Sequence, residues 1–215
     1  MPYSPRYNVL FIHIPKTGGT SVEQALGVFA DWQLENQVTL FGMIQDPDLK
    51  SRAWGSAFLQ HLTFAEIQQV WSYPDAHILA CVRNPWARFA SVYRNLDTHL
   101  QQTALAMGIQ LDGLSFPDFV AATEDLNHAH LRPQSDYLPD PAYQDVPLHL
   151  LRTESLHRDF ERVCQQLELK LSLPWSNRSP SQEPWHKLYS PSTWACIGQR
   201  YQQDVLRFGY EQCTD

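Results

Sequence analysis

The sequence predicts an α/β fold, in which a central and mostly parallel β-sheet is flanked by helices. Short apolar runs rich in β-forming residues alternate along the chain with segments of helical periodicity, and this alternation is typical of parallel sheets. The length of 215 residues and the hydrophobic content of 43% are sufficient for one packed core. We therefore expect residues 1–215 to form a single domain.

The first half of the chain contains two predicted strands, each followed by a helix. Tyr7–Ile14 (YNVLFIHI) and His77–Val82 (HILACV) are continuous apolar runs and are typical of buried central strands. After the first run, Thr20 and Glu23 match the S/T-x-x-E pattern of a helix start. After the second, Asn84-Pro85 supplies an N-cap and a first-turn proline. The helices predicted here are Thr20–Phe29, a short helix from Thr63 to about Trp71, and one from about Trp86.

The second half contains a third strand and longer connections. Leu148–Leu151 is the predicted strand, and Thr153–Leu167 after it has apolar residues at helical spacing. Residues 125–147 contain four prolines and no clear period, which predicts a long functional loop. The remaining predictions are helices at Phe116–Thr123 and Pro191–Phe208 and a loop over residues 172–189.

Charge and cysteine content argue against several classes of protein. Sixteen Lys and Arg against 23 Asp and Glu give a net charge of -7, opposite to the balance of proteins that coat nucleic acid. No apolar stretch approaches the roughly 18 residues of a membrane span, and the N-terminus does not resemble a signal peptide. The cysteines form no CxxC pair, which favours free thiols. We therefore expect a cytoplasmic protein with no metal site.

The loop PKTGGTS, residues 15–21, has the composition of an anion-binding site. Glycines let backbone N–H groups approach a phosphate, and the N-terminus of the next helix adds partial positive charge. The lysine can contact the anion as a point charge. This loop predicts a P-loop-like, three-layer fold, although the lysine precedes the glycines and G-x-x-x-x-G-K-[ST] is absent. The candidate anion-binding residues are Lys16, Thr17, Gly18, Gly19, Thr20 and Ser21.

A second cationic segment follows the second predicted strand. Residues 83–94 contain three arginines, whereas residues 17–49 and 95–131 contain no Lys or Arg. Arg83 comes directly after the strand, where parallel sheets bind ligands, and Ser91 lies about two turns into the next helix. A guanidinium fork and a hydroxyl can converge on one phosphate. Because the strand runs into Arg83 and not into an Asp that could hold Mg²⁺, we expect two anion sites that rely on Lys and Arg.

These motifs resemble those of the carbohydrate sulfotransferases, in the branch that includes the heparan 2-O- and chondroitin sulfotransferases. FIHIPKTGGTS (residues 11–21) is similar to the 5′-phosphosulfate loop of that family, and CVRNPWARFASVYRN (81–95) is similar to its 3′-phosphate segment. HLRPQSDYL (130–138) and YQQDVLRFGY (201–210) resemble two further stretches common in the branch. The resemblance therefore extends over nearly the whole chain.

The resemblance implies a donor, 3′-phosphoadenosine 5′-phosphosulfate (PAPS), and transfer of its sulfuryl group to a hydroxyl, which leaves adenosine 3′,5′-bisphosphate. By position, Lys16 would contact the oxygen between phosphate and sulfate and stabilise its charge as the bond breaks. Residues 17–21 would hold the 5′-phosphate, and Arg83 and Ser91 the 3′-phosphate.

Attack by the acceptor's hydroxyl benefits from a general base, most often a histidine or a carboxylate. QHLTFAEI (60–67) resembles the segment in which a histidine serves as base in the heparan 2-O branch, with Gln60 where that pattern usually has glycine. His61 is therefore the first candidate. Glu66 is a distant one, because with Thr63 it also fits a helix cap.

Residues of the long loop provide the other candidates. His130 is the second candidate base, or it orients the acceptor together with Arg132 and Gln134. His13, at the end of a core strand, is more typical of a packed histidine than of a catalyst.

The acidic chain favours an acceptor that is not a polyanion: a neutral sugar, a glycolipid or a small-molecule hydroxyl. Two other functions stay open at this point. A non-catalytic module would bind adenosine 3′,5′-bisphosphate without turnover, and a P-loop-like nucleotide kinase would use ATP and Mg²⁺. The sequence does not indicate an oligomeric state.

Overall fold

The computed structural model of the chain describes residues 3–4, 6–28, 59–68, 75–141, 147–174 and 183–210. The chain divides into two compact units, and each unit takes its residues from two separate stretches of the sequence. The first unit comprises Met1–Val82 and Asp136–Asn177, and the second comprises Arg83–Ser135 and Arg178–Asp215. The prediction of one domain over residues 1–215 stays a prediction.

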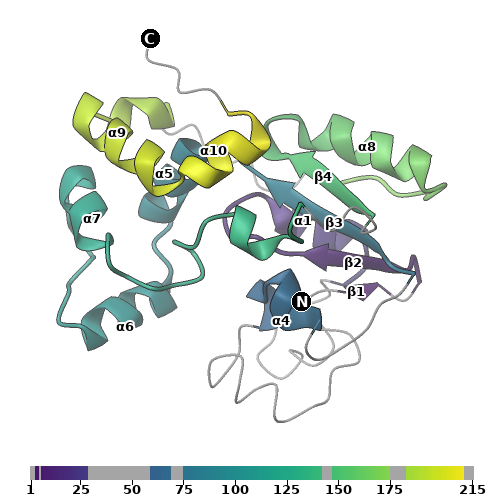
Figure 1. Cartoon of the computed structure of the whole chain (residues 1–215), viewed down its shortest axis with the longest axis horizontal. Helices are drawn as coiled ribbons and strands as arrows, with labels where there is room; N and C mark the ends of the chain where they lie inside the picture. The colour runs from purple at the N-terminus through teal and green to yellow at the C-terminus, as the bar shows by residue number, and fades with distance from the viewer. Residues whose placement is uncertain are drawn as a thin grey trace. The chain divides into compact units, whose positions relative to one another are not determined.

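The first unit is built on a four-stranded sheet with the strand order β1-β2-β3-β4 (Figure 1). Strands β2, β3 and β4 are parallel, and β1 pairs with β2 in the antiparallel direction. The α/β class with a central, mostly parallel sheet is thereby confirmed. The strands are β1 (Tyr3–Ser4), β2 (Val9–Ile12), β3 (His77–Val82) and β4 (Leu148–Arg152).

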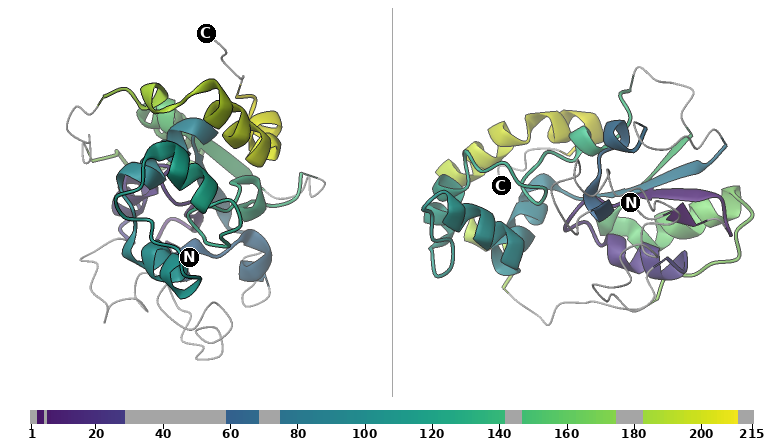
Figure 2. Two further views of the ribbon diagram at one scale, coloured as in Figure 1. Left: turned by 90° about the vertical axis from the view of Figure 1, so that its left-hand side faces the viewer. Right: turned by 90° about the horizontal axis from the view of Figure 1, so that it is seen from below.

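Helices α1 (Gly19–Ala25) and α8 (Leu156–Gln166) pack on the same face of this sheet (Figure 2, right). Phe11 of β2 and Cys81 of β3 lie in one apolar cluster with side chains of both helices. Residues that alternate with these, such as Leu10 and Ala80, are also buried, so both faces of the sheet are covered. Burial on both faces explains why β2 and β3 are continuous apolar runs.

The other elements of the first unit differ from prediction mainly in their bounds. Helix α4 (Phe64–Gln68) follows a 3₁₀ turn, η2 (Leu59–His61). The helix predicted from Thr153 begins at Leu156, because Thr153–Ser155 form a 3₁₀ turn, η4, between β4 and α8. Strand β3 has the predicted bounds, whereas the two-residue strand β1 was not predicted.

The second unit is helical. Its core contains Trp86 and Phe89 of α5, Phe119 of α7, and Tyr201 between α9 and α10. The predicted helix Pro191–Phe208 is interrupted at Tyr201, whose buried hydroxyl donates a hydrogen bond to the carbonyl oxygen of Leu131 at 2.8 Å. The elements are α5 (Pro85–Arg94), α6 (Thr98–Ala106), α7 (Phe116–Ala122), η5 (Trp185–Leu188), α9 (Pro191–Arg200) and α10 (Gln202–Phe208), and η3 (Ser135–Tyr137) begins where this unit's first stretch ends.

Two further observations concern predictions made from composition. No helix among the described ranges is both long and apolar enough to cross a membrane. Cys81, Cys164 and Cys196 carry free thiols, and burial raises the pKa of Cys81 and Cys164 above the usual range. Cys213 lies outside the described residues.

Candidate functional site

The loop between β2 and α1 holds Lys16 in a left-handed backbone conformation. The φ angle is 66° at Lys16 and 83° at Gly18. A left-handed conformation costs a non-glycine residue about 1–2 kcal/mol, whereas glycine adopts it readily. Strain of this kind at a non-glycine residue is typical of functional sites. The loop therefore holds its lysine in a backbone conformation that the surrounding structure must stabilise.

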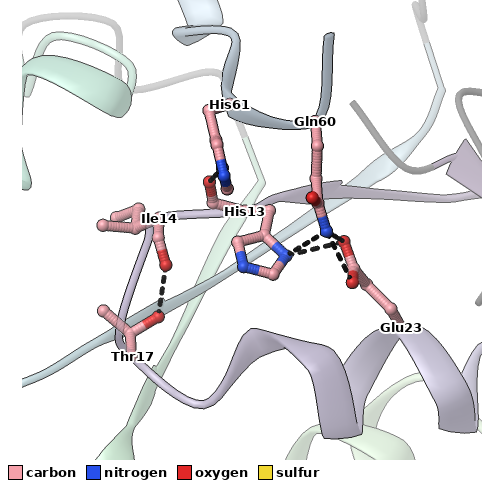
Figure 3. Close-up of polar contacts among 6 residues, drawn as sticks. All are labelled: His13, Ile14, Thr17, Glu23, Gln60 and His61. Atoms are coloured by element: carbon pink, nitrogen blue, oxygen red, sulfur yellow. Dashed lines mark hydrogen bonds and ion pairs between the residues drawn. The ribbon is translucent and has the colours of Figure 1, made fainter. Parts of the chain in front are cut away.

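Two threonine hydroxyls provide that stabilisation. The buried hydroxyl of Thr17 donates to the carbonyl oxygen of Ile14 at 2.8 Å (Figure 3). The carbonyl oxygen of Thr17 accepts from the hydroxyl of Thr153 at 2.6 Å, and that hydroxyl also lies 3.1 Å from the carbonyl oxygen of Val82. Thr153 therefore ties the loop to the ends of β3 and β4, a role that the sequence did not indicate.

Each of the two glycines of the loop is needed for a different structural reason. Gly18 is the N-cap of α1 and needs its positive φ. Gly19 is the first residue of α1, and a Cβ atom there would lie 3.0 Å from Cε1 of Phe11 and 3.1 Å from Cε1 of His13. Its missing side chain therefore allows α1 to approach β2 closely. The next two residues of α1 are Thr20, which is half-buried, and Ser21, which is buried.

A polar cluster of the buried side chains of His13 and Glu23 and the half-buried side chain of Gln60 lies beside this loop (Figure 3). Nδ1 of His13 lies 2.6 Å from Oε1 of Glu23, and Nε2 of Gln60 donates to both carboxylate oxygens at 2.9 and 3.0 Å. Because a carboxylate only accepts, Nδ1 of His13 carries the hydrogen of their contact. Burial by itself raises the pKa of Glu23, but His13 and Gln60 lower it more, so the net pKa is below the usual range.

His61 lies against this cluster. Its Nδ1 donates to the carbonyl oxygen of His13 at 3.2 Å, and the two imidazole rings are 5.1 Å apart, edge to face. In a neutral ring whose Nδ1 carries the hydrogen, Nε2 carries the lone pair. The structure therefore holds His61 in the tautomer that a general base acting through Nε2 requires.

Glu66, the distant candidate for the base, forms a helix cap. Its Oε2 accepts from the backbone N–H of Thr63 at 2.7 Å and from the hydroxyl of Thr63 at 2.8 Å. The backbone N–H of Glu66 donates back to that hydroxyl at 3.2 Å. This reciprocal pair begins α4, as the S/T-x-x-E pattern indicates.

In the second unit, Arg83 precedes α5, and Ser91 lies within that helix. The capping side chain is Asn84, which accepts from the backbone N–H of Ala87 at 3.1 Å. The main chain of Arg83 is held by Gln134: its N–H donates to Oε1 at 2.9 Å, and its carbonyl oxygen accepts from Nε2 at 2.8 Å. Arg83 and Ser91 are both half-buried.

The loop that carries His130, Arg132 and Gln134 is fixed from α5. Arg88, which is 2% exposed, donates to the carbonyl oxygens of Arg132 and His130 at 3.0 and 3.2 Å. His130 and Gln134 are buried and Arg132 is half-buried. Gln134 thus has both polar ends of its side chain on the backbone of Arg83, and its role in binding the acceptor stays a prediction.

His128 lies next to His130 and pairs with a third histidine. Its Nδ1 accepts from the backbone N–H of His130 at 3.2 Å, so the hydrogen of a neutral ring is on Nε2, which lies 2.9 Å from Nδ1 of His99. Burial, with smaller contributions from His99 and Arg132, lowers the pKa of His128 to about 4, although Asp97 acts in the opposite direction.

The structure therefore gathers the predicted residues into two groups. Lys16 with its loop and His61 belong to the first unit, and Arg83, Ser91, His130, Arg132 and Gln134 belong to the second. Sequence reasoning missed the side chains that hold these groups in place, which are Glu23, Gln60, Arg88, Thr153 and Asp204. Within the described ranges, no three His, Cys, Asp or Glu side chains are arranged to hold a metal ion.

Comparison with known proteins identifies the family of the chain. A family model with the description "Sulfotransferase family" matches residues 1–211. No curated protein and no solved structure matches the chain. The family match includes both cationic segments and both candidate histidines.

Proposed function

Because the chain belongs to the sulfotransferase family, we propose that it transfers a sulfuryl group from PAPS to a hydroxyl group of its acceptor. The observation that carries the proposal is the family match over residues 1–211, together with the strained backbone of Lys16 in the glycine loop. A nucleotide with phosphates at two positions requires two anion sites. The chain has two cationic segments, each following a parallel strand.

In this proposal the loop Lys16–Ser21 binds the 5′-phosphosulfate of PAPS. Lys16 contributes a positive charge, and Thr17, Gly18, Gly19, Thr20 and Ser21 contribute backbone N–H groups or hydroxyls. Arg83 and Ser91 bind the 3′-phosphate, which distinguishes PAPS from ordinary adenine nucleotides.

The reaction is an in-line displacement at sulfur. The acceptor's hydroxyl oxygen attacks the sulfur atom while Nε2 of His61 takes the hydroxyl proton. The bond between sulfur and the bridging oxygen breaks, and its electron pair stays on the phosphate. Lys16 stabilises that developing charge. The tautomer that the His13 carbonyl imposes on His61 supports its role as the base.

His130 is the alternative base, and it otherwise orients the acceptor with Arg132 and Gln134. We propose a neutral sugar, a glycolipid or a small-molecule hydroxyl as the acceptor, because the chain has a net charge of -7 and residues 95–131 lack Lys and Arg. A cytoplasmic location remains part of this proposal.

The experiment is a thermal-shift comparison of adenosine 3′,5′-bisphosphate with AMP, which differ only in the 3′-phosphate. A ligand that binds the folded state raises its melting temperature. We expect the bisphosphate to raise it more than AMP does at the same concentration. Equal shifts would contradict the assignment of Arg83 and Ser91. Binding of the bisphosphate with no turnover of PAPS on any hydroxyl acceptor would instead indicate a non-catalytic nucleotide-binding module.

A further inference from the structure

One side chain pairs with both polar backbone groups of Arg83. Oε1 of Gln134 accepts from the N–H of Arg83, and Nε2 of Gln134 donates to the carbonyl oxygen of Arg83. The amide therefore occupies the donor and the acceptor of one residue together, as a neighbouring strand does. Neither peptide group beside Arg83 can rotate without losing a hydrogen bond.

Asp204 of α10 holds Gln134 in turn. Its Oδ2 accepts from the backbone N–H of Gln134 at 2.8 Å and lies 3.3 Å from Nε2, and its Oδ1 accepts from the backbone N–H of Ser135 at 2.7 Å. Gln134 and Asp204 are both 0% exposed. A buried carboxylate is strongly unfavourable unless its oxygens accept hydrogen bonds. These three donors account for its position inside the unit.

Gln134 and Asp204 together form a clamp on Arg83, and the loop that carries Gln134 is supported at both ends. The guanidinium group of Arg88 holds the carbonyl oxygens of His130 and Arg132, and Arg207 donates to the carbonyl oxygen of Ser135 at 3.1 Å. Gln134 therefore projects from a loop that α5 and α10 fix on either side, and its amide has little freedom to follow a displaced Arg83.

We infer that Gln134 and Asp204 are positioning residues that determine the preference for a 3′-phosphate by holding Arg83. The inference rests on the proposed function, in which Arg83 binds that phosphate. A guanidinium group binds phosphate through a planar fork, so a small displacement of its backbone weakens the contact. Gln134 lies in HLRPQSDYL and Asp204 in YQQDVLRFGY, the two motifs outside the nucleotide-binding segments. The inference therefore gives both motifs a role in recognising PAPS, the sulfuryl donor.

The test is isothermal titration of the full chain with adenosine 3′,5′-bisphosphate and with AMP. The variant Gln134→Met keeps the length of the side chain and removes both hydrogen bonds to Arg83. We expect its affinity for the bisphosphate to fall about tenfold or more, and its affinity for AMP to change by less than about twofold. A residue with a purely structural role would not change the ratio of these two affinities.

Two further variants make the result specific. Asp204→Asn places a donor where an acceptor is needed and should lower the same ratio, which provides an independent test should Gln134→Met not fold. Thr123→Val is the matched control, because Thr123 is buried in the same unit and hydrogen bonded to Phe119 and Arg200. It should lower the melting temperature without changing the ratio.

The outcomes separate the inference from the proposed function. A wild-type protein without a preference for the bisphosphate would contradict the proposed function. A wild-type protein with that preference, retained in folded Gln134→Met or Asp204→Asn, would overturn the inference and leave the proposed function standing.

Discussion

The backbones around Lys16 and Arg83 are stabilised in different ways. Around Lys16, the left-handed backbone at Lys16 and Gly18 is held partly from within the motif, by the hydroxyl of Thr17, which donates to Ile14, and partly by the hydroxyl of Thr153. Around Arg83, the stabilising side chain is Gln134, which is 51 residues away, and Asp204 lies another 70 residues along the chain. A motif that contains its own restraints can be recognised in the sequence, whereas restraints from distant segments become visible only in the fold.

The largest expected effect is that of replacing His61, which hydrogen bonds to the carbonyl oxygen of His13 close to the Lys16 loop. His61→Ala removes the proposed base and should lower turnover by about 10²–10⁴-fold. Affinity for adenosine 3′,5′-bisphosphate should change little, because the proposed mechanism gives His61 no contact with the nucleotide. The measurement is release of the bisphosphate from PAPS in the presence of acceptor.

His157→Ala is the control for this variant, since His157 is an exposed histidine of the same unit. Normal turnover in His61→Ala would contradict the assignment of His61 as the base, and His130 would be the next residue to test.

The next prediction separates the two cationic residues. Lys16→Ala should lower turnover by about 10²–10³-fold, because in the proposed mechanism its charge acts mainly as the bond to sulfur breaks. Arg83→Ala should instead abolish the preference for adenosine 3′,5′-bisphosphate over AMP. Turnover and both affinities are measured on each variant, with Lys170→Ala as an exposed control. Identical defects in the two variants would show that the two regions do not divide binding and chemistry in this way.

The smallest effect concerns stability in acid. Folded His128 has a pKa of about 4 against 6.5 ordinarily, so between these values the unfolded chain binds a proton that the folded chain does not. The free energy of unfolding should therefore fall as the pH drops from 6.5 to 4, by at most about 3 kcal/mol. Glu23 acts in the other unit and at lower pH: its lowered pKa contributes stability above 4.5 that is lost as the pH falls through its folded value.

Chemical denaturation at a series of pH values measures both contributions. His128→Asn keeps an acceptor for the backbone N–H of His130 and should flatten the profile between pH 6.5 and 4. Glu23→Gln should remove the stability that Glu23 contributes above pH 4.5, and should flatten the profile only below 4.5. A wild-type profile in His128→Asn would contradict the assignment of the higher range to the second unit.

The sequence predicted elements whose pattern is strong and local. Strand β3 has the predicted bounds because all of it except His77 is buried on both faces. Helix α6 was missed because only Leu100 and Ala104 of its nine residues are buried, which leaves a weak apolar pattern. The break at Tyr201 was missed for another reason: the hydroxyl of Tyr201 hydrogen bonds to Leu131 on a distant segment, and the local sequence pattern gives no sign of that contact.

The same distinction applies to the candidate site. Lys16 and its glycines follow a recognisable pattern, and the backbone angles explain the need for Gly18. Gln60, a departure from the Gly-His pattern, has a partner that no pattern indicates, since its amide binds the carboxylate of Glu23. His13 is a packed histidine, as its place at the end of a strand indicated, but its contact with Glu23 depends on how α1 lies against β2.

Because each unit is made from two stretches of the chain, neither can finish folding while the ribosome is still making the middle of the protein. Strand β4 cannot pair with β3 until residue 148 has emerged, and Arg83 has no complete clamp until Asp204 is available. N-terminal parts of proteins generally fold first during synthesis, but here the early part lacks partners for its own sheet and helices. A truncation anywhere between residues 136 and 177 would remove parts of both units together.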